Sequence, residues 1–92
     1  MSIRIKLLSS LGKLTGTTSV ELDANFNTLD KAMNELWRLY PELRKEMLYR
    51  DGTMDFIYQI ILNGERVVWP DDKDIKLKDK AQLALMVFMA GG

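Results

Sequence analysis

The chain has 92 residues, and its 13 Lys and Arg are balanced by 13 Asp and Glu, which gives no net charge at pH 7. This length predicts one domain, and the absence of a concentrated basic patch argues against nucleic-acid binding and against a polybasic membrane anchor. Cysteine and histidine are absent, which excludes disulfides, thiolate nucleophiles, the usual zinc ligand sets and the most common general base.

The first predicted element is a strand in the N-terminal segment MSIRIKLLSS. Ile3, Ile5 and Leu7 alternate with Arg4 and Lys6, a period typical of a half-buried strand. The segment has neither the apolar core nor the cleavage site of a signal peptide, and no apolar run reaches the about 18 residues of a membrane span. We therefore expect a cytoplasmic protein without a membrane segment.

A second strand and a helix follow. Gly16 marks a turn, and the spacing of Val20 and Leu22 predicts a strand that pairs with the first in an antiparallel hairpin. Thr28 is a suitable N-cap for a helix that ends near Pro41, where one further short turn can begin. The helical period is carried by apolar residues at Leu29, Met33, Leu36 and Tyr40.

Three more strands are predicted in the second half. The run IYQIIL is followed by Asn63-Gly64, the strongest two-residue hairpin signal, so ERVVW is predicted as the returning strand, ended by Pro70. Ile75 and Leu77 interrupt a polar connection and are expected to pin it to the core. The last strand is predicted from Leu83 to Met89.

The predicted order is therefore strand, strand, helix, strand, strand, strand. One helix covering one face of a mixed sheet is the simplest two-layer packing for this order. Because both hairpins are local, we place a non-local pairing between the first and last strands. The fold class is α+β, and residues 1–92 are expected to form a single domain with a flexible tail at 88–92.

The last strand is apolar on both faces. Leu83, Leu85 and Val87 fall on one face, and the other carries Ala84, Met86 and Phe88. Since only one helix is available to cover them, the second face is either covered by loops or reserved for a partner. Under the second interpretation, Met86 and Ala84 are the candidate partner interface.

The sequence closes on Ala90-Gly91-Gly92. A frayed end or an expression remnant is one interpretation. The other is a thin thread: the four residues from Met89 to Gly92 can extend about 13 Å, and glycines pass through slots that Cβ atoms would block. The reactive group is then the α-carboxylate of Gly92, which another enzyme can activate with ATP as an acyl adenylate, so the carrier itself needs no catalytic side chain.

These segments resemble the small subunit of molybdopterin synthase (MoaD), within the ubiquitin-like β-grasp sulfur carriers. The resemblance spans essentially the whole chain and is carried by LGKLTG at 11–16, RLYPEL at 38–43, ILNGERV at 61–67, LKDKAQLAL at 77–85 and the closing AGG. The chain departs from the family at Gly12, where many members have arginine, and at Val87 and Phe88, where members often have prolines.

The resemblance implies a β-grasp fold in which the last strand is central and parallel to the first. It also implies that a MoeB-like activating enzyme uses ATP to adenylate Gly92, which becomes a thiocarboxylate. The tail, guided by Phe88, Met89 and Ala90, would enter the MoaE-like large subunit, whose catalytic residues build the dithiolene of molybdopterin. The chain itself would bind no cofactor and no metal.

Several other residue groups have a functional and a structural interpretation. A cation site is conceivable in the acidic loop at Asp71, Asp72 and Asp74, but the spacing lacks the glycine and distal glutamate of a calcium loop. Asp51 and Asp55 bracket a turn, and surface roles are favoured over acid–base work. For Trp37 and Trp69, core packing is favoured over a planar ligand.

Three hypotheses remain open on the sequence alone. The leading one is a sulfur carrier of molybdenum or tungsten cofactor synthesis. The second is a ubiquitin-like modifier joined through Gly92 to lysines of other proteins, or a sulfur carrier for thiamine or thiolated tRNA. The third is a plain interaction module.

Overall fold

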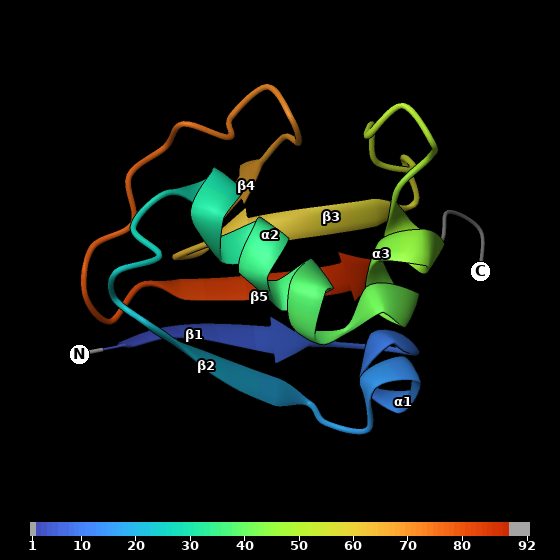
Figure 1. Ribbon diagram of the computed structural model, residues 1–92, viewed down its shortest axis with the longest axis horizontal. Coiled ribbons are helices and arrows are strands. Elements are labelled where there is room, and N and C mark those ends of the chain that lie inside the picture. The colour runs from blue at the N-terminus through green and yellow to red at the C-terminus, as the bar shows by residue number, and fades with distance from the viewer. Residues whose placement is uncertain (1, 89–92) are drawn as a thin grey trace.

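The structure, a computed structural model, describes residues 2–88 and consists of a five-stranded sheet with helices packed on one face and at one end (Figure 1). The elements in chain order are β1 (Ser2–Leu7), α1 (Leu11–Thr15), β2 (Ser19–Asp23), α2 (Leu29–Leu39), α3 (Pro41–Met47), β3 (Tyr58–Leu62), β4 (Glu65–Val67) and β5 (Gln82–Val87). All five predicted strands and the main helix are present.

The strand order in the sheet is β2-β1-β5-β3-β4. β1 and β5 are parallel, and the other three pairs are antiparallel. The last strand is therefore central, between β1 and β3, and the non-local pairing predicted between the first and last strands is confirmed. This is the predicted β-grasp arrangement.

The main helix begins as the sequence predicts. The side chain of Thr28 accepts a hydrogen bond from the backbone N–H of Lys31 (3.1 Å), which satisfies one of the free amides of the first turn. The helix α2 ends at Leu39, before Pro41, and Pro41 is the first residue of α3, which is longer than the predicted single turn.

The short helix α1 was not predicted from the periodicity. It lies in the connection between β1 and β2, and Gly16 ends it in the left-handed conformation (φ 75°) rather than forming a simple turn. Gly12 lets the helix approach the strand ends: an added Cβ would lie 3.1 Å from the Leu7 carbonyl oxygen and 3.2 Å from Thr18 Cγ2. The departure at Gly12 thus coincides with a close packing contact.

The strand β4 is shorter than predicted. It stops at Val67, the last residue paired with β3, and the backbone N–H of Val68 donates to the carboxylate of Asp72 (2.7 Å). The hairpin before it has the predicted turn, with Asn63 and Gly64 both at positive φ (48° and 87°). The connection after it is pinned as expected, since Leu77 is buried.

The core lies between the helices and one face of the sheet. Ile3, Ile5 and Leu7 of β1 are buried, and so are Leu83 and Leu85 of β5. The helices contribute Leu29, Ala32, Met33, Leu36, Trp37, Leu43 and Met47. In Figure 1, α2 and α3 lie over one face of the sheet and α1 lies beyond the end of β1. Within residues 2–88 the opposite face, here called the open face, carries no helix.

Candidate functional site

The open face carries an apolar centre between two cations. Strand register places Lys6 of β1 beside Ala84 of β5, Ala84 beside Ile61 of β3, and Ile61 beside Arg66 of β4. Cross-strand neighbours share one face of a sheet, so these four side chains form one row. Lys6 and Arg66 are exposed, while Ala84 and Ile61 are half-buried.

Met86 and Phe88 extend this apolar centre along β5. Met86 lies beside Gln59 and is half-buried. Phe88 continues the alternation and is 53% exposed, whereas Leu83 and Leu85, on the helix side of the same strand, are almost fully buried. The sequence-predicted candidates Ala84, Met86 and Phe88 therefore lie on the open face.

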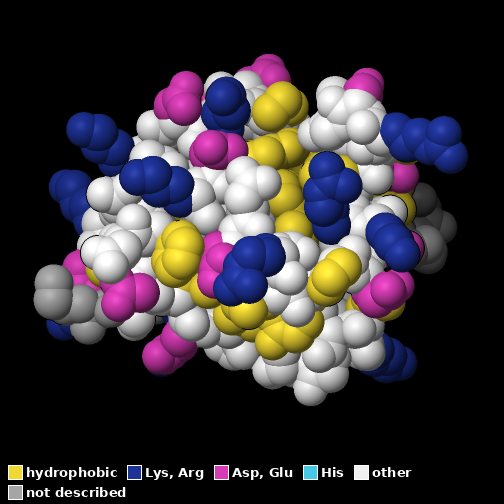
Figure 2. All heavy atoms as spheres, viewed as in Figure 1, with side chains coloured by type: hydrophobic (Ala, Val, Ile, Leu, Met, Phe, Trp, Pro, Cys, Tyr) yellow, Lys and Arg dark blue, Asp and Glu magenta, His cyan; other side chains and the backbone are white. Residues whose placement is uncertain are grey.

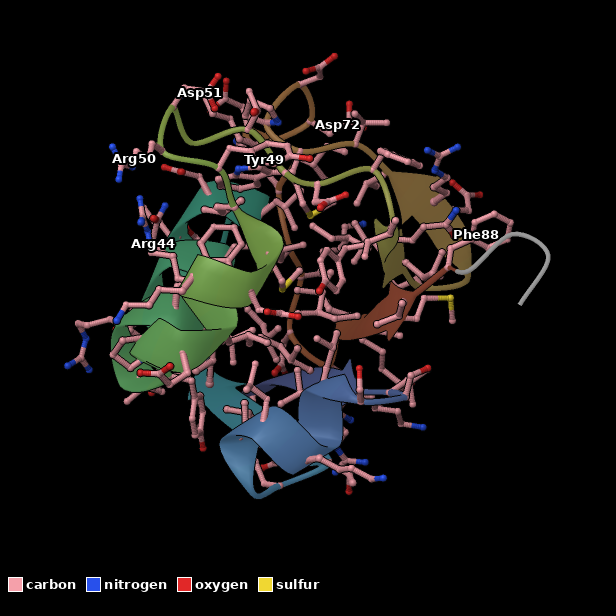
Figure 3. The ribbon with its side chains drawn as sticks, turned by 90° about the vertical axis from the view of Figure 1, so that its right-hand side faces the viewer. Arg44, Tyr49, Arg50, Asp51, Asp72 and Phe88 are labelled. Atoms are coloured by element: carbon pink, nitrogen blue, oxygen red, sulfur yellow. The ribbon has the colours of Figure 1, made fainter. Side chains whose placement is uncertain are left out.

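Phe88 is the last described residue, and it is attached to the sheet. Its backbone N–H donates to the carbonyl of Ile57, one residue beyond the paired strands β3 and β5. In Figure 3, Phe88 lies on the far side of the molecule from Arg44 of α3 and from Arg50. The remaining predicted site residues, Met89, Ala90, Gly91 and Gly92, lie outside the described residues.

Charged side chains occur on both sides of the sheet. On the helix side, basic and acidic side chains lie interspersed (Figure 2). On the open face, Arg4 forms an exposed ion pair with Glu21 of β2 (2.8 Å), but no ion pair within residues 2–88 involves Lys6 or Arg66. A partner surface with carboxylates around an apolar centre would complement this face.

A second feature lies at the β4 edge and was missed in the sequence. A hollow of about 170 Å³, called here the edge hollow, is bordered by Phe56, Val68 and Trp69. Its polar lining includes Asp55, Tyr58, Gln59 and Arg66. Phe56 is 86% exposed. The sequence signal for this hollow was Phe56, an aromatic residue directly before the strand IYQIIL. Its place in a turn keeps its side chain from the core.

Tyr58 is a buried polar residue beside this hollow. Its hydroxyl donates to a carboxylate oxygen of Glu46 (3.0 Å), so β3 and α3 are joined by a side-chain hydrogen bond. Burial, followed by the hydrogen bond to Glu46, raises the pKa of Tyr58 to about 12 from an ordinary value of 10.0.

This shift predicts a loss of stability at alkaline pH. Because the folded pKa is raised, the stabilisation is fully present below pH 10 and is lost as the pH rises toward 12. We expect Tyr58 to account for a decrease of about 2 kcal/mol in the free energy of unfolding across this range. Urea unfolding of wild type and Tyr58→Phe at a series of pH values measures this decrease. The difference in the free energy of unfolding between the two proteins should narrow or reverse as the pH rises. A constant difference would contradict the raised pKa of Tyr58.

Three of the acidic residues singled out in the sequence, Asp51, Asp55 and Asp72, accept hydrogen bonds from neighbouring groups. Asp51 accepts hydrogen bonds from the backbone N–H (3.0 Å) and hydroxyl (2.6 Å) of Thr53, and these bonds lower the pKa of Asp51. Asp55 accepts from the backbone N–H of Ile57 (3.2 Å), and Asp72 from Val68. Within residues 2–88, no group of three or more acidic residues is placed to hold a metal ion.

The two tryptophans pack against each other. Their rings are T-shaped with centroids 5.1 Å apart, and Trp37 is 2% exposed. The indole N–H of Trp69 donates to the carbonyl of Gly52 (3.2 Å). This arrangement fits core packing, which the sequence favours, rather than an open site for a planar ligand.

None of the helices in the described part of the chain is long and apolar enough to cross a membrane. The chain matches no protein-family model and no curated protein sequence.

Solved structures provide the comparison. SAMP1 from Haloferax volcanii is 24% identical over the full length of both chains, with a TM-score of 0.84. A putative molybdopterin converting factor, subunit 1, from Pyrococcus furiosus is 19% identical, covering 97% of this chain and 99% of that one (TM-score 0.74). A chain of the BexX/CysO complex from Amycolatopsis orientalis is 18% identical over 98% and 99% (TM-score 0.77). At these identities the likeness is one of fold: the chain has the β-grasp architecture that these three structures share.

Proposed function

We propose that this chain is a sulfur carrier of molybdenum or tungsten cofactor biosynthesis. The α-carboxylate of Gly92 attacks the α-phosphate of ATP on a MoeB-like activating enzyme, which forms the acyl adenylate and releases pyrophosphate. A sulfur nucleophile then displaces AMP and leaves a thiocarboxylate. The tail carries this sulfur into a MoaE-like large subunit, which supplies the catalytic residues for dithiolene formation.

The observation that carries the proposal is the position of β5. It is the central strand of the sheet, it is held on both sides by β1 and β3, and it leads through Phe88 into the closing residues Met89 to Gly92. A thread that starts from a strand paired on both sides can be presented to an enzyme without any change in the core. The likeness to a putative molybdopterin converting factor subunit favours the cofactor pathway.

A second candidate function is a ubiquitin-like modifier that is joined through Gly92 to lysines of other proteins. The likeness in fold to SAMP1, a small archaeal modifier protein, favours it, and it uses the same adenylate. A sulfur carrier for thiamine or tRNA thiolation is the remaining alternative. Adenylation is common to all of them, so it is tested first.

The test of this common step is ATP–pyrophosphate exchange by the adenylating enzyme purified from the cells that make the chain. We expect exchange to depend on added chain and to saturate with its concentration. If the chain does not stimulate exchange above the enzyme alone, both the carrier and the modifier proposals fail.

The role of the open face has its own prediction. We expect Phe88→Asp to weaken binding to the MoaE-like large subunit by about tenfold or more, because a charge would replace an aromatic contact. Leu14→Asp is the control, since Leu14 is similarly exposed (42%, against 53% for Phe88) but lies on α1. Titration calorimetry gives the affinities. An unchanged affinity together with a large loss of thermal stability would assign Phe88 to the core instead.

A further inference from the structure

The edge hollow combines exposed apolar side chains from two parts of the chain. Phe56 occupies the turn in which the N–H of Tyr58 donates to the carbonyl of Asp55 (3.1 Å), and this turn holds its ring away from the core. Val68, which is 43% exposed, and Trp69 border the same hollow. Both belong to the connection after β4. A single exposed apolar residue is ordinary, but two exposed side chains, Phe56 and Val68, beside the half-buried Trp69 form a receptacle for an apolar side chain.

One charge in the hollow is unmatched within the described chain. The polar groups of Asp55, Tyr58 and Trp69 are each engaged, with the N–H of Ile57, the carboxylate of Glu46 and the carbonyl of Gly52 respectively. The guanidinium of Arg66, in contrast, has neither a hydrogen bond nor an ion pair with any residue from 2 to 88. Charge complementarity therefore favours an occupant that carries a carboxylate beside its apolar group.

The hollow is continuous with the open face and lies close to the start of the tail. Gln59 and Arg66 line the hollow and also belong to the cross-strand rows of the open face. Phe56 precedes Ile57, whose carbonyl accepts the hydrogen bond from Phe88. A protein that binds the tail can therefore contact the edge hollow at the same time.

Strand addition at this edge is a weaker alternative. β4 has only three residues, and the N–H of Val68 is already taken by Asp72. Little backbone is left to pair with an incoming strand, so side chains rather than a ladder must supply the contact.

We propose that the edge hollow is a docking site for the activating enzyme, which inserts an apolar side chain between Phe56, Val68 and Trp69 and pairs a carboxylate with Arg66. This inference rests on the proposed function. The activating enzyme is the chosen occupant because adenylation precedes both sulfur transfer and conjugation, so it is the one partner that every carboxylate-based function requires.

The experiment is ATP–pyrophosphate exchange by the purified activating enzyme, with the concentration of the chain varied. We expect Phe56→Ser and Arg66→Glu each to raise the KM for the chain about tenfold, with kcat within about twofold of wild type. Leu39→Ser and Arg44→Glu are the matched controls, because both residues are exposed and belong to the helix layer, on α2 and α3. Their KM should equal that of wild type.

The outcomes separate this inference from the proposed function. If wild type is adenylated and both hollow variants have the KM of the controls, the docking site is wrong and the proposed function stands. A fall in kcat at unchanged KM also contradicts docking. If wild type is not adenylated, both proposals fail. Thermal unfolding checks the fold, and since Arg66 is an exposed side chain, Arg66→Glu carries the test even if Phe56→Ser is unstable.

Discussion

Removal of Gly92 is expected to abolish adenylation while the fold remains intact. The proposed nucleophile is the terminal carboxylate, and displacement of a reacting group by even 1 Å costs about a hundredfold in rate. The loss of a whole residue should therefore bring ATP–pyrophosphate exchange to the background of the enzyme alone. The midpoint of thermal unfolding should not change, since the buried core ends at Leu85 and the last paired strand at Val87.

A one-residue extension gives the matched control. Adding one glycine after Gly92 moves the carboxylate and should have the same effect as the deletion. Adding one glycine before Ser2 changes the composition equally but should leave exchange at the wild-type rate. Retained exchange in the deletion and in the C-terminal extension would mean that another group on the chain is activated.

The second large effect is expected at Leu85. This residue is fully buried on the central strand, and its neighbours in the adjacent strands are Leu7 of β1 and Ile60 of β3, both of them also buried. Leu85→Ala leaves a cavity that rigid strands on both sides cannot close, so we expect a loss of about 2–5 kcal/mol in the free energy of unfolding. Against a typical total of about 5–15 kcal/mol, this is a large fraction.

Urea denaturation of Leu85→Ala and Leu14→Ala measures the contrast. Both variants lose the same atoms, but Leu14 is 42% exposed on α1, so its change should cost less than about 1 kcal/mol. Similar losses in the two variants would contradict the assignment of Leu85 to the centre of the core.

The elements predicted from the sequence are those with a strong local signal. Alternation at Ile3, Ile5 and Leu7 identified β1, and the helical period from Leu29 with the cap at Thr28 identified α2. The helix α1 has five residues, which is little more than one turn and too short to show a period. The end of β4 was misplaced because the strand-like run ERVVW continues beyond Val67, the last residue that is paired with β3.

The site was predictable to a smaller extent. The two apolar faces of the last strand follow from alternation, so Ala84, Met86 and Phe88 could be placed on one face. Their flanking by Lys6 and Arg66 could not, because it depends on the register of four strands that are distant in sequence. The pairing of β1 with β5 was predicted because both hairpins are local, but its parallel direction was implied only by the resemblance, since no local pattern specifies it.

Intact-mass analysis tests directly whether Gly92 carries sulfur as a thiocarboxylate. The chain should be purified with an N-terminal tag from the cells that make it, and the free and conjugated fractions resolved together. We expect a free species that is heavier by the exchange of one oxygen for sulfur, and fragmentation should place this exchange at Gly92. A series of Gly92-to-lysine conjugates without that species would contradict the sulfur-carrier function and identify the chain as a protein modifier.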